Sequence, residues 1–258
     1  MICRQERHLI IQARLRSMEI SHLYELGTLE STYWWHVAKR QLITEMLKTH
    51  VPPPSLLVEG GIGAGGNLQR WQSIGYTVQG LDCLDESIAF AKEQGIENVA
   101  VHDLHQPWPV QQNSAGAVVL LDVLEHLADP VIALQYAARS LSPSGKIFFT
   151  VPAYPWLFSD WDRRLGHFRR YTRAMMQEQV KQAGLKLETL RHWNAFTLPA
   201  AIVLRIVRRL RPSSRGTEFP RVSRWINHAL LGAASIERRV GPMFGMPCGL
   251  SLVGVITK

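Results

Sequence analysis

Three acidic side chains stand at the ends of apolar runs in this chain of 258 residues. Glu59, Asp82 and Asp103 each follow a run typical of a short buried strand. Strands of one parallel sheet would bring these carboxylates to the edge where open α/β sheets hold ligands. Asp82 can then accept hydrogen bonds from both hydroxyls of a ribose, and Asp103 one from an adenine amino group. For Asp82, helix capping is the alternative.

A glycine-rich loop follows Glu59 and leads into a helical pattern that runs through Trp71. Glycines at positions 61, 63 and 65 allow positive φ angles and a close approach of a ligand to the backbone. The turn also leaves the first N–H groups of the following helix free. An acid before such a loop suits a cofactor with a positive centre and a ribose; a plain structural turn is the alternative.

A second group of reactive side chains lies between residues 154 and 171. Aromatic, acidic and basic residues are mixed there too densely for a plain core or a plain solvated surface. We predict an acceptor pocket, with a structural Asp–Arg network over an aromatic core as the alternative. The predicted substrate-binding residues are Tyr154, Trp156, Asp162, Arg169, Arg170 and Tyr171.

Two histidines are candidates for a general base, because imidazole titrates near neutral pH. His126 follows the apolar run 117–121, and His167 lies within the mixed segment. Asp160 joins them in the predicted catalytic set as a carboxylate able to hold His167. Each histidine has a structural role as its alternative. Asp160 and Asp162 with His167 match no established metal spacing, so the sequence predicts no metal.

Five expected strands alternate with helices between residues 56 and 151, the pattern of a doubly wound α/β fold. Two more strands are expected at 185–193 and 250–258. The predicted helices outside the central unit span 21–50, 172–183, 200–211 and 222–240.

Composition describes a globular chain with 46% hydrophobic and 19% charged residues. The three cysteines are far apart and lack metal spacing, so we expect a reduced, cytoplasmic setting. No apolar run is long enough for a membrane span, and the basic segment Met1–Ser17 lacks the apolar stretch of a secretory signal. Met18 is an alternative start.

Charge is unevenly distributed. Residues 160–258 carry 18 Lys and Arg against 6 Asp and Glu, a net charge of +12, whereas residues 1–159 have a net charge of −4. Such a basic half favours anionic partners. Residues 200–211 form a basic amphipathic helical pattern, with an apolar stripe at Val203, Ile206, Val207 and Leu210 and with Arg205, Arg208, Arg209 and Arg211 outside it.

That helix has three interpretations. It is a cap helix that buries its stripe on the body, or it lies on an anionic membrane surface and delivers a lipid-like acceptor. Nucleic acid binding is favoured by charge alone, because no recognised module is present.

Taken in order, these motifs resemble those of class I S-adenosylmethionine-dependent methyltransferases, in the type 11/12-like branch with a basic C-terminal cap. The resemblance covers roughly residues 30–193. Ser144 replaces a second glycine of many members, and no cysteine lies between the first glycines; neither departure removes a required contact. The matching motifs are Glu59-x-Gly61-x-Gly63-x-Gly65, Gly80-Leu81-Asp82, Asp122-Val123-Leu124-Glu125-His126 and Leu141-x-Pro143-x-Gly145.

The resemblance implies a seven-stranded Rossmann-like sheet and S-adenosylmethionine as cofactor. Glu59 and the glycine loop would contact its amino acid part, and Leu121 to Val123 would line the floor of the site. The family pattern of an aromatic pair followed by basic residues is matched by Trp34-Trp35 and by Lys39-Arg40, and of the two cations Arg40 would pair with the cofactor carboxylate. The implied cofactor-binding set is Trp34, Arg40, Glu59, Gly61, Gly63, Gly65, Asp82, Cys83, Asp103, Leu104, Leu121, Asp122 and Val123.

A nicotinamide oxidoreductase is the competing class, because Gly61-x-Gly63-x-x-Gly66 and Asp82 also fit a dinucleotide. The acid before the glycines, the single mononucleotide half and the lack of a Tyr-x-x-x-Lys motif count against it. A regulatory protein that binds the cofactor without turnover is a further alternative.

The predicted function is methyl transfer to an O, N or C atom of a hydrophobic small molecule, and the expected location is cytoplasmic. In one version of this prediction the acceptor is lipid-linked, and the protein then makes peripheral contact with the inner face of an anionic membrane. The predicted segments are an N-terminal extension (1–20), a helical segment covering the cofactor (21–54), the α/β core (55–193), a helical cap insertion (194–249) and the final strand (250–258).

Overall fold

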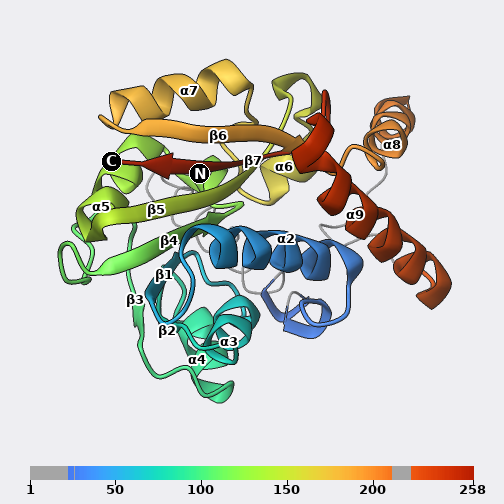
Figure 1. Ribbon diagram of the computed structural model, residues 1–258. Coiled ribbons are helices and arrows are strands. Elements are labelled where there is room, and N and C mark those ends of the chain that lie inside the picture. Colours follow the sequence, from blue (N-terminus) through green and yellow to red (C-terminus); the bar gives the residue numbers. More distant parts are fainter. Residues whose placement is uncertain (1–22, 26, 211–221) are drawn as a thin grey trace, which may run out of the picture.

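The computed structural model describes residues 23–25, 27–210 and 222–258. Its centre is a seven-stranded sheet in the order β3-β2-β1-β4-β5-β7-β6, in which β7 runs antiparallel to the other six strands (Figure 1). The predicted seven-stranded α/β sheet is confirmed. The strands are β1 (Leu56–Gly60), β2 (Thr77–Asp82), β3 (Val99–Val101), β4 (Ala115–Leu121), β5 (Leu141–Pro152), β6 (Lys186–Trp193) and β7 (Ser251–Thr257).

Helices cover both faces of the sheet. Helices α2, α3 and α4 pack on one face, and α5 and α7 pack on the other. The α-helices are α2 (Trp34–His50), α3 (Gly66–Gln72), α4 (Asp85–Glu93), α5 (Pro130–Ser140), α6 (Asp160–Arg164), α7 (Arg173–Gln182), α8 (Leu198–Leu210) and α9 (Arg224–Phe244), with 3-10 turns η1 (Leu124–His126) and η2 (Pro155–Leu157).

Strand β4 explains why one core forms on each face. Val118 and Leu120 belong to one apolar cluster, and Val119 and Leu121 belong to the other. A strand buried on both faces requires an uninterrupted apolar run, which is what the sequence shows here. The strand ends at the carboxyl edge of the sheet, immediately before Asp122.

The first long helix is shorter than the predicted 21–50. It begins at Trp34, after a turn, and its own N-cap residue offers no capping side chain. Asn227 of α9 supplies the cap, because its side chain accepts from the Trp34 N–H at 2.8 Å and donates to the Thr32 carbonyl at 3.0 Å. A residue 193 positions further along thus fixes the start of α2. The predicted extension 1–20 lies outside the described residues.

Helix α8 lies at the margin of the molecule (Figure 1). Arg205 points inward, with its Nη1 3.1 Å from Asp162 Oδ2 and also bonded to the Ser159 hydroxyl. The predicted alternative in which this helix buries its stripe is therefore wrong for the described side chains. The apolar side chains of α8 that are between 42% and 60% exposed are Val203, Leu204, Ile206 and Val207.

The rest of the predicted basic face, residues 208–211, has no described side chains. None of the described helices combines the length and apolar character needed to cross a membrane.

Candidate functional site

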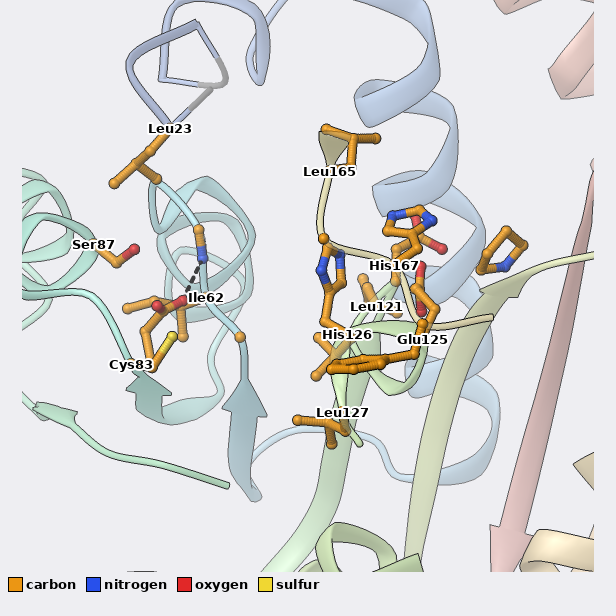
Figure 2. Close-up of a pocket in the computed structure, with 18 of the residues that line it drawn as sticks. Leu23, Ile62, Cys83, Ser87, Leu121, Glu125, His126, Leu127, Leu165 and His167 are labelled. Atoms are coloured by element: carbon orange, nitrogen blue, oxygen red, sulfur yellow. Dashed lines mark hydrogen bonds between the residues drawn. The ribbon is translucent and has the colours of Figure 1, made fainter. Parts of the chain in front are cut away.

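A cavity of about 760 Å³ opens at the carboxyl edge of β1, β2 and β4. The loops after β1, β2 and β3, residues 121–123 at the end of β4, and Lys39 of α2 form one side, which we call the sheet wall. The other side, which we call the cap wall, consists of Glu125 and His126, lining residues between positions 161 and 170, and two residues of α8. Figure 2 shows Ile62 and Cys83 on the first side and His126 and His167 on the second. This volume suits a cofactor-sized ligand.

The turn after β1 has a backbone geometry that glycine allows. Gly61 and Gly63 have φ angles of +73° and +55°. The Gly61 N–H donates to the Leu81 carbonyl at 2.7 Å. A Cβ atom on Gly61 would lie 2.5 Å from Val123 Cγ2. A larger residue could not take this path against the sheet wall.

Asp82 joins β2 to this turn. Its Oδ2 accepts from the Gly63 N–H at 3.1 Å, and its Oδ1 accepts from the Leu84 N–H at 3.0 Å. Burial raises the pKa of the Asp82 carboxyl, while these N–H donors act in the opposite direction. Asp82 and Cys83 both line the cavity.

Glu59 lies behind the cavity lining. Its side chain is buried, and Asn67 Nδ2 donates to its Oε1 at 2.9 Å. Burial raises the pKa of Glu59 well above its usual value. Asn67 lines the cavity, so Glu59 would act on a ligand through Asn67. Gly65, with φ of +85°, also lies outside the lining and caps the start of α3.

Lys39 faces the cavity in place of the predicted Arg40. Its Nζ lies 2.6 Å from Asp122 Oδ2. Arg40 turns away and donates to the carbonyls of Gly66 (3.0 Å) and Glu30. Burial alone would raise the pKa of Asp122, but the Lys39 ammonium holds it below its usual value.

The aromatic pair shows the same displacement by one position. Trp35 lines the cavity, whereas Trp34 packs on Phe196 with ring centroids 5.8 Å apart. Trp35 and Lys39 are four residues apart and share a helix face, which Trp34 and Arg40 do not. Helical spacing was the signal that could have identified Lys39.

The far end of the sheet wall contains Asp103 and Leu104, after β3. The His105 N–H donates to Asp103 Oδ1 at 2.9 Å, and this bond lowers the pKa of Asp103. Leu121, which ends β4, and the two residues that follow it complete the wall. The structure therefore brings Asp82, Asp103 and Asp122 to one side of one cavity.

Asp162 holds the cap wall together. Its carboxylate is fully buried and lies 2.7 Å from Arg170 Nη2, 3.1 Å from Arg205 Nη1 and 3.3 Å from His167 Nδ1. It also accepts from the Ser159 N–H at 2.8 Å, which starts α6. Burial opposes its ionisation, but His167 and the two arginines hold the pKa of Asp162 far below its usual range.

The two candidate bases meet at the cavity. The rings of His126 and His167 are edge to face, with centroids 4.5 Å apart. Glu125 is fully buried beside them, and burial raises its pKa well above the usual value. One ligand atom from each of these three residues lies within 4.8 Å of the others, so among the described residues this cluster could hold a cation.

Most of the remaining predicted residues lie away from the lining. Asp160 is exposed and paired with Arg163 at 2.6 Å, so Asp162 and not Asp160 is the carboxylate that holds His167. Of the predicted substrate-binding residues, only Arg170 lines the cavity. Those outside the lining are Asp162 beneath it, Tyr154 stacked on His192, exposed Trp156, Arg169 bonded to the Ala128 carbonyl and buried Tyr171 bonded to the Leu124 carbonyl.

A model of the methyltransferase domain matches residues 34–190, which is more than half of the chain. The chain belongs to the methyltransferase domain family. Ubiquinone biosynthesis O-methyltransferases from Idiomarina loihiensis and Xanthomonas oryzae pv. oryzae are 30% identical over 99 residues and 29% identical over 96 residues. Each match covers 34% of this chain and 40% of the relative, so the chain spans about two fifths of the curated relatives it matches.

Many solved structures are similar to this methyltransferase, and two of them illustrate the likeness. One is the Haloferax volcanii putative methyltransferase in complex with the activator Trm112, with a TM-score of 0.61, 19% identity and coverage of 94% and 96%. The other is the Haemonchus contortus phosphoethanolamine N-methyltransferase 2, with a TM-score of 0.55, 18% identity and coverage of 84% and 52%. At such identities the likeness shows the fold alone.

The predicted methyltransferase class is confirmed by the family match. The cofactor predicted for it is S-adenosylmethionine. The sheet wall fits this cofactor chemically. Among its described residues, the acids Asp82, Asp103 and Asp122 outnumber the one cation, Lys39, which suits a ligand with a sulfonium and an ammonium group. The roles of individual residues stay predictions.

Replacing Asp162 by Asn should lower the free energy of unfolding by about 3–5 kcal/mol at neutral pH, because buried Arg170 loses its charged partner. The advantage of the wild type is present above the unfolded-state pKa, about 3.9, and shrinks as pH falls below it, because the folded-state pKa is depressed. Urea unfolding at neutral and acidic pH measures both effects. Asp160→Asn, on the exposed surface, is the control; equal stability of wild type and Asp162→Asn at neutral pH contradicts this account.

Proposed function

We propose that this methyltransferase holds S-adenosylmethionine against the sheet wall and methylates a hydrophobic acceptor bound at the cap wall. The cofactor supplies an activated methyl group with a neutral thioether as leaving group. The observation that carries the proposal is that one cavity is lined by Asp82 and Asp103 on the sheet wall and by His126 and His167 on the cap wall. Figure 2 shows the two histidines across the cavity from Ile62 and Cys83. Much of the acceleration then comes from positioning.

On the sheet wall, Asp82 accepts hydrogen bonds from the ribose and Asp103 from the adenine. Lys39, in place of Arg40, pairs with the carboxylate of the cofactor. Asn67, held by Glu59, contacts its amino acid part. This assignment is supported by the hydrogen bonds that already fix Asp82 and by the position of Lys39 in the lining.

On the cap wall, His167 or His126 removes the proton of the acceptor. The Asp162 carboxylate, 3.3 Å from His167 Nδ1, favours a proton on that nitrogen and a lone pair on Nε2. This arrangement supports His167 as the base, with His126 against its ring.

The acceptor is proposed to be hydrophobic and lipid-linked. The curated relatives are named O-methyltransferases of ubiquinone biosynthesis, which favours an oxygen atom on a hydrophobic molecule. Helix α8 contributes Ala201 and Arg205 to the cap wall while exposing apolar side chains such as Ile206 and Val207. An apolar acceptor can pass from a membrane along this helix into the cavity.

The same helix supports peripheral contact with the inner, cytoplasmic face of an anionic membrane. Its exposed apolar side chains can enter the interface, and the net charge of +12 over residues 160–258 favours an anionic surface. No observation favours the oxidoreductase or the non-catalytic alternative.

Asp82→Ala should weaken binding of S-adenosylmethionine by roughly 1–3 kcal/mol, because its buried hydrogen bonds to the ribose are lost. Isothermal titration measures the change. Glu93→Ala, an exposed acid on α4, is the matched control and should bind like the wild type. An unchanged affinity for Asp82→Ala contradicts the ribose assignment.

Incubation with methyl-labelled cofactor and a membrane lipid extract should place label in the fraction soluble in organic solvent. The reason is that a lipid-linked acceptor partitions there together with its methylated product. Asp82→Ala at limiting cofactor should label less, and Glu93→Ala should match the wild type. Label found only on water-soluble products would overturn the lipid-linked acceptor while leaving methyl transfer intact.

The protein should float with phosphatidylglycerol vesicles at low salt and be released by high salt, because screening weakens the headgroup contacts. Ile206→Ser and Val207→Ser should each reduce the bound fraction. Val101→Ser, an exposed apolar residue on β3, is the control. Equal recovery with neutral vesicles, or no recovery, counts against the membrane contact.

A further inference from the structure

A second groove runs along α2, on the helix face opposite Trp35 and Lys39. Its volume is about 830 Å³, and it shares no lining residue with the cavity between the sheet wall and the cap wall. Helix α2 lies between α3 and α9, and both contribute to the groove (Figure 1). The residues that line it are Ser31, Val37, Arg40, Gln41, Thr44, Glu45, Lys48, Gly66, Gln69, Arg70, Ser73 and Arg238.

Four cations from three helices line this groove, against one acid. Arg40 and Lys48 come from α2, Arg70 from α3 and Arg238 from α9. The acid is Glu45, whose Oε1 lies 2.8 Å from Arg238 Nε. Arg238 also donates to the Gln41 side chain at 2.6 Å, across 197 positions of sequence. The charge of Arg238 is thus compensated within the groove.

Arg40 is compensated from behind the groove. It donates to the carbonyls of Gly66 and Glu30, and the buried Glu30 carboxylate accepts from the Gly66 N–H at 3.1 Å. Burial lowers the pKa of Arg40, the charge of Glu30 raises it, and the charge of Arg70 lowers it again. Arg70 therefore adds a like charge beside a half-buried guanidinium group.

Arg70 and Lys48 have no compensating group. Within residues 23–25, 27–210 and 222–258, neither side chain takes part in a hydrogen bond or an ion pair. Both are exposed to water, which makes them available to a ligand. Cations that line one concave surface strengthen its positive potential and attract multivalent anions.

We infer that this groove is a binding site for a soluble molecule that carries several phosphate groups. The planar fork of arginine matches phosphate oxygens. Ser31, Gln69 and Ser73 add uncharged hydrogen-bond donors to the same lining. The inference is independent of the methyl acceptor, because the groove is separate from the first cavity.

Two other sources of phosphate fit the groove less well. A flat bilayer surface does not enter a groove between helices. Val37 is the one large apolar side chain of the described lining, which contains no aromatic ring. A nucleic acid strand would therefore find no platform on which its bases could stack.

Isothermal titration of the full-length protein with inorganic triphosphate tests the inference. One saturable site per chain is expected, with an affinity that falls as NaCl is raised. Citrate should bind more weakly, because its carboxylates offer fewer oxygens to the arginine forks; equal binding of citrate overturns the assignment to phosphate. Triphosphate should bind equally well when S-adenosylmethionine is present. Strict competition between the two would place triphosphate in the first cavity and overturn the site.

Variants of the two uncompensated cations locate the site. Arg70→Gln and Lys48→Gln should each weaken triphosphate binding by roughly tenfold, because a charge-assisted contact to phosphate is lost. Lys92→Gln is the matched control, since Lys92 is an exposed lysine of α4 that lines neither cavity. Equal loss in Lys92→Gln and Arg70→Gln overturns the inference.

Nuclear magnetic resonance of the wild type decides the location without any variant. Triphosphate should shift the amide resonances of Gln69 and Ser73, which line the groove. Shifts confined to the cap wall and α8 would assign the anion to that part of the chain and overturn the inference. Unchanged binding of S-adenosylmethionine by Arg70→Gln and Lys48→Gln reports that their fold is intact.

Discussion

The backbone turn that follows β1 determines the arrangement of the whole site. The Gly61 N–H bonds to the Leu81 carbonyl, and the Gly63 N–H bonds to the Asp82 carboxylate. These bonds join two parallel strands just beyond their ends, in a left-handed backbone that glycine allows. The chain then rises into α3 and leaves the space above the strand ends open. The cavity exists because this turn stays close to the sheet.

Local patterns explain which parts of the site could be predicted from the sequence. The glycine loop and the acids at 82 and 103 are set by strand ends and turns, and both are encoded within a few residues. The same holds for the apolar run of β4, which is buried on both faces. Lys39 was also within reach, since helical spacing pairs it with Trp35 and leaves Arg40 on another face.

The cap wall depends on contacts that no local pattern reveals. Asp160 and Asp162 are two positions apart and similar in sequence context, yet only the second is buried. The choice is made by the capping interaction with Ser159 and by Arg205, which comes from 43 residues further along. The apolar stripe of α8 was visible in sequence, but its direction was fixed by that inward arginine. Long-range charge pairing, not periodicity, oriented this half of the site.

The cap that Asn227 places on α2 has a consequence for synthesis of the chain. Lys39 belongs to α2, but the end of that helix is satisfied by a side chain made 193 residues after Trp34. While the chain emerges from the ribosome, α2 lacks this cap until Asn227 of α9 has been synthesised. Helix α2 and helix α9 are therefore expected to reach their final structure together, late in translation, as one cooperative unit.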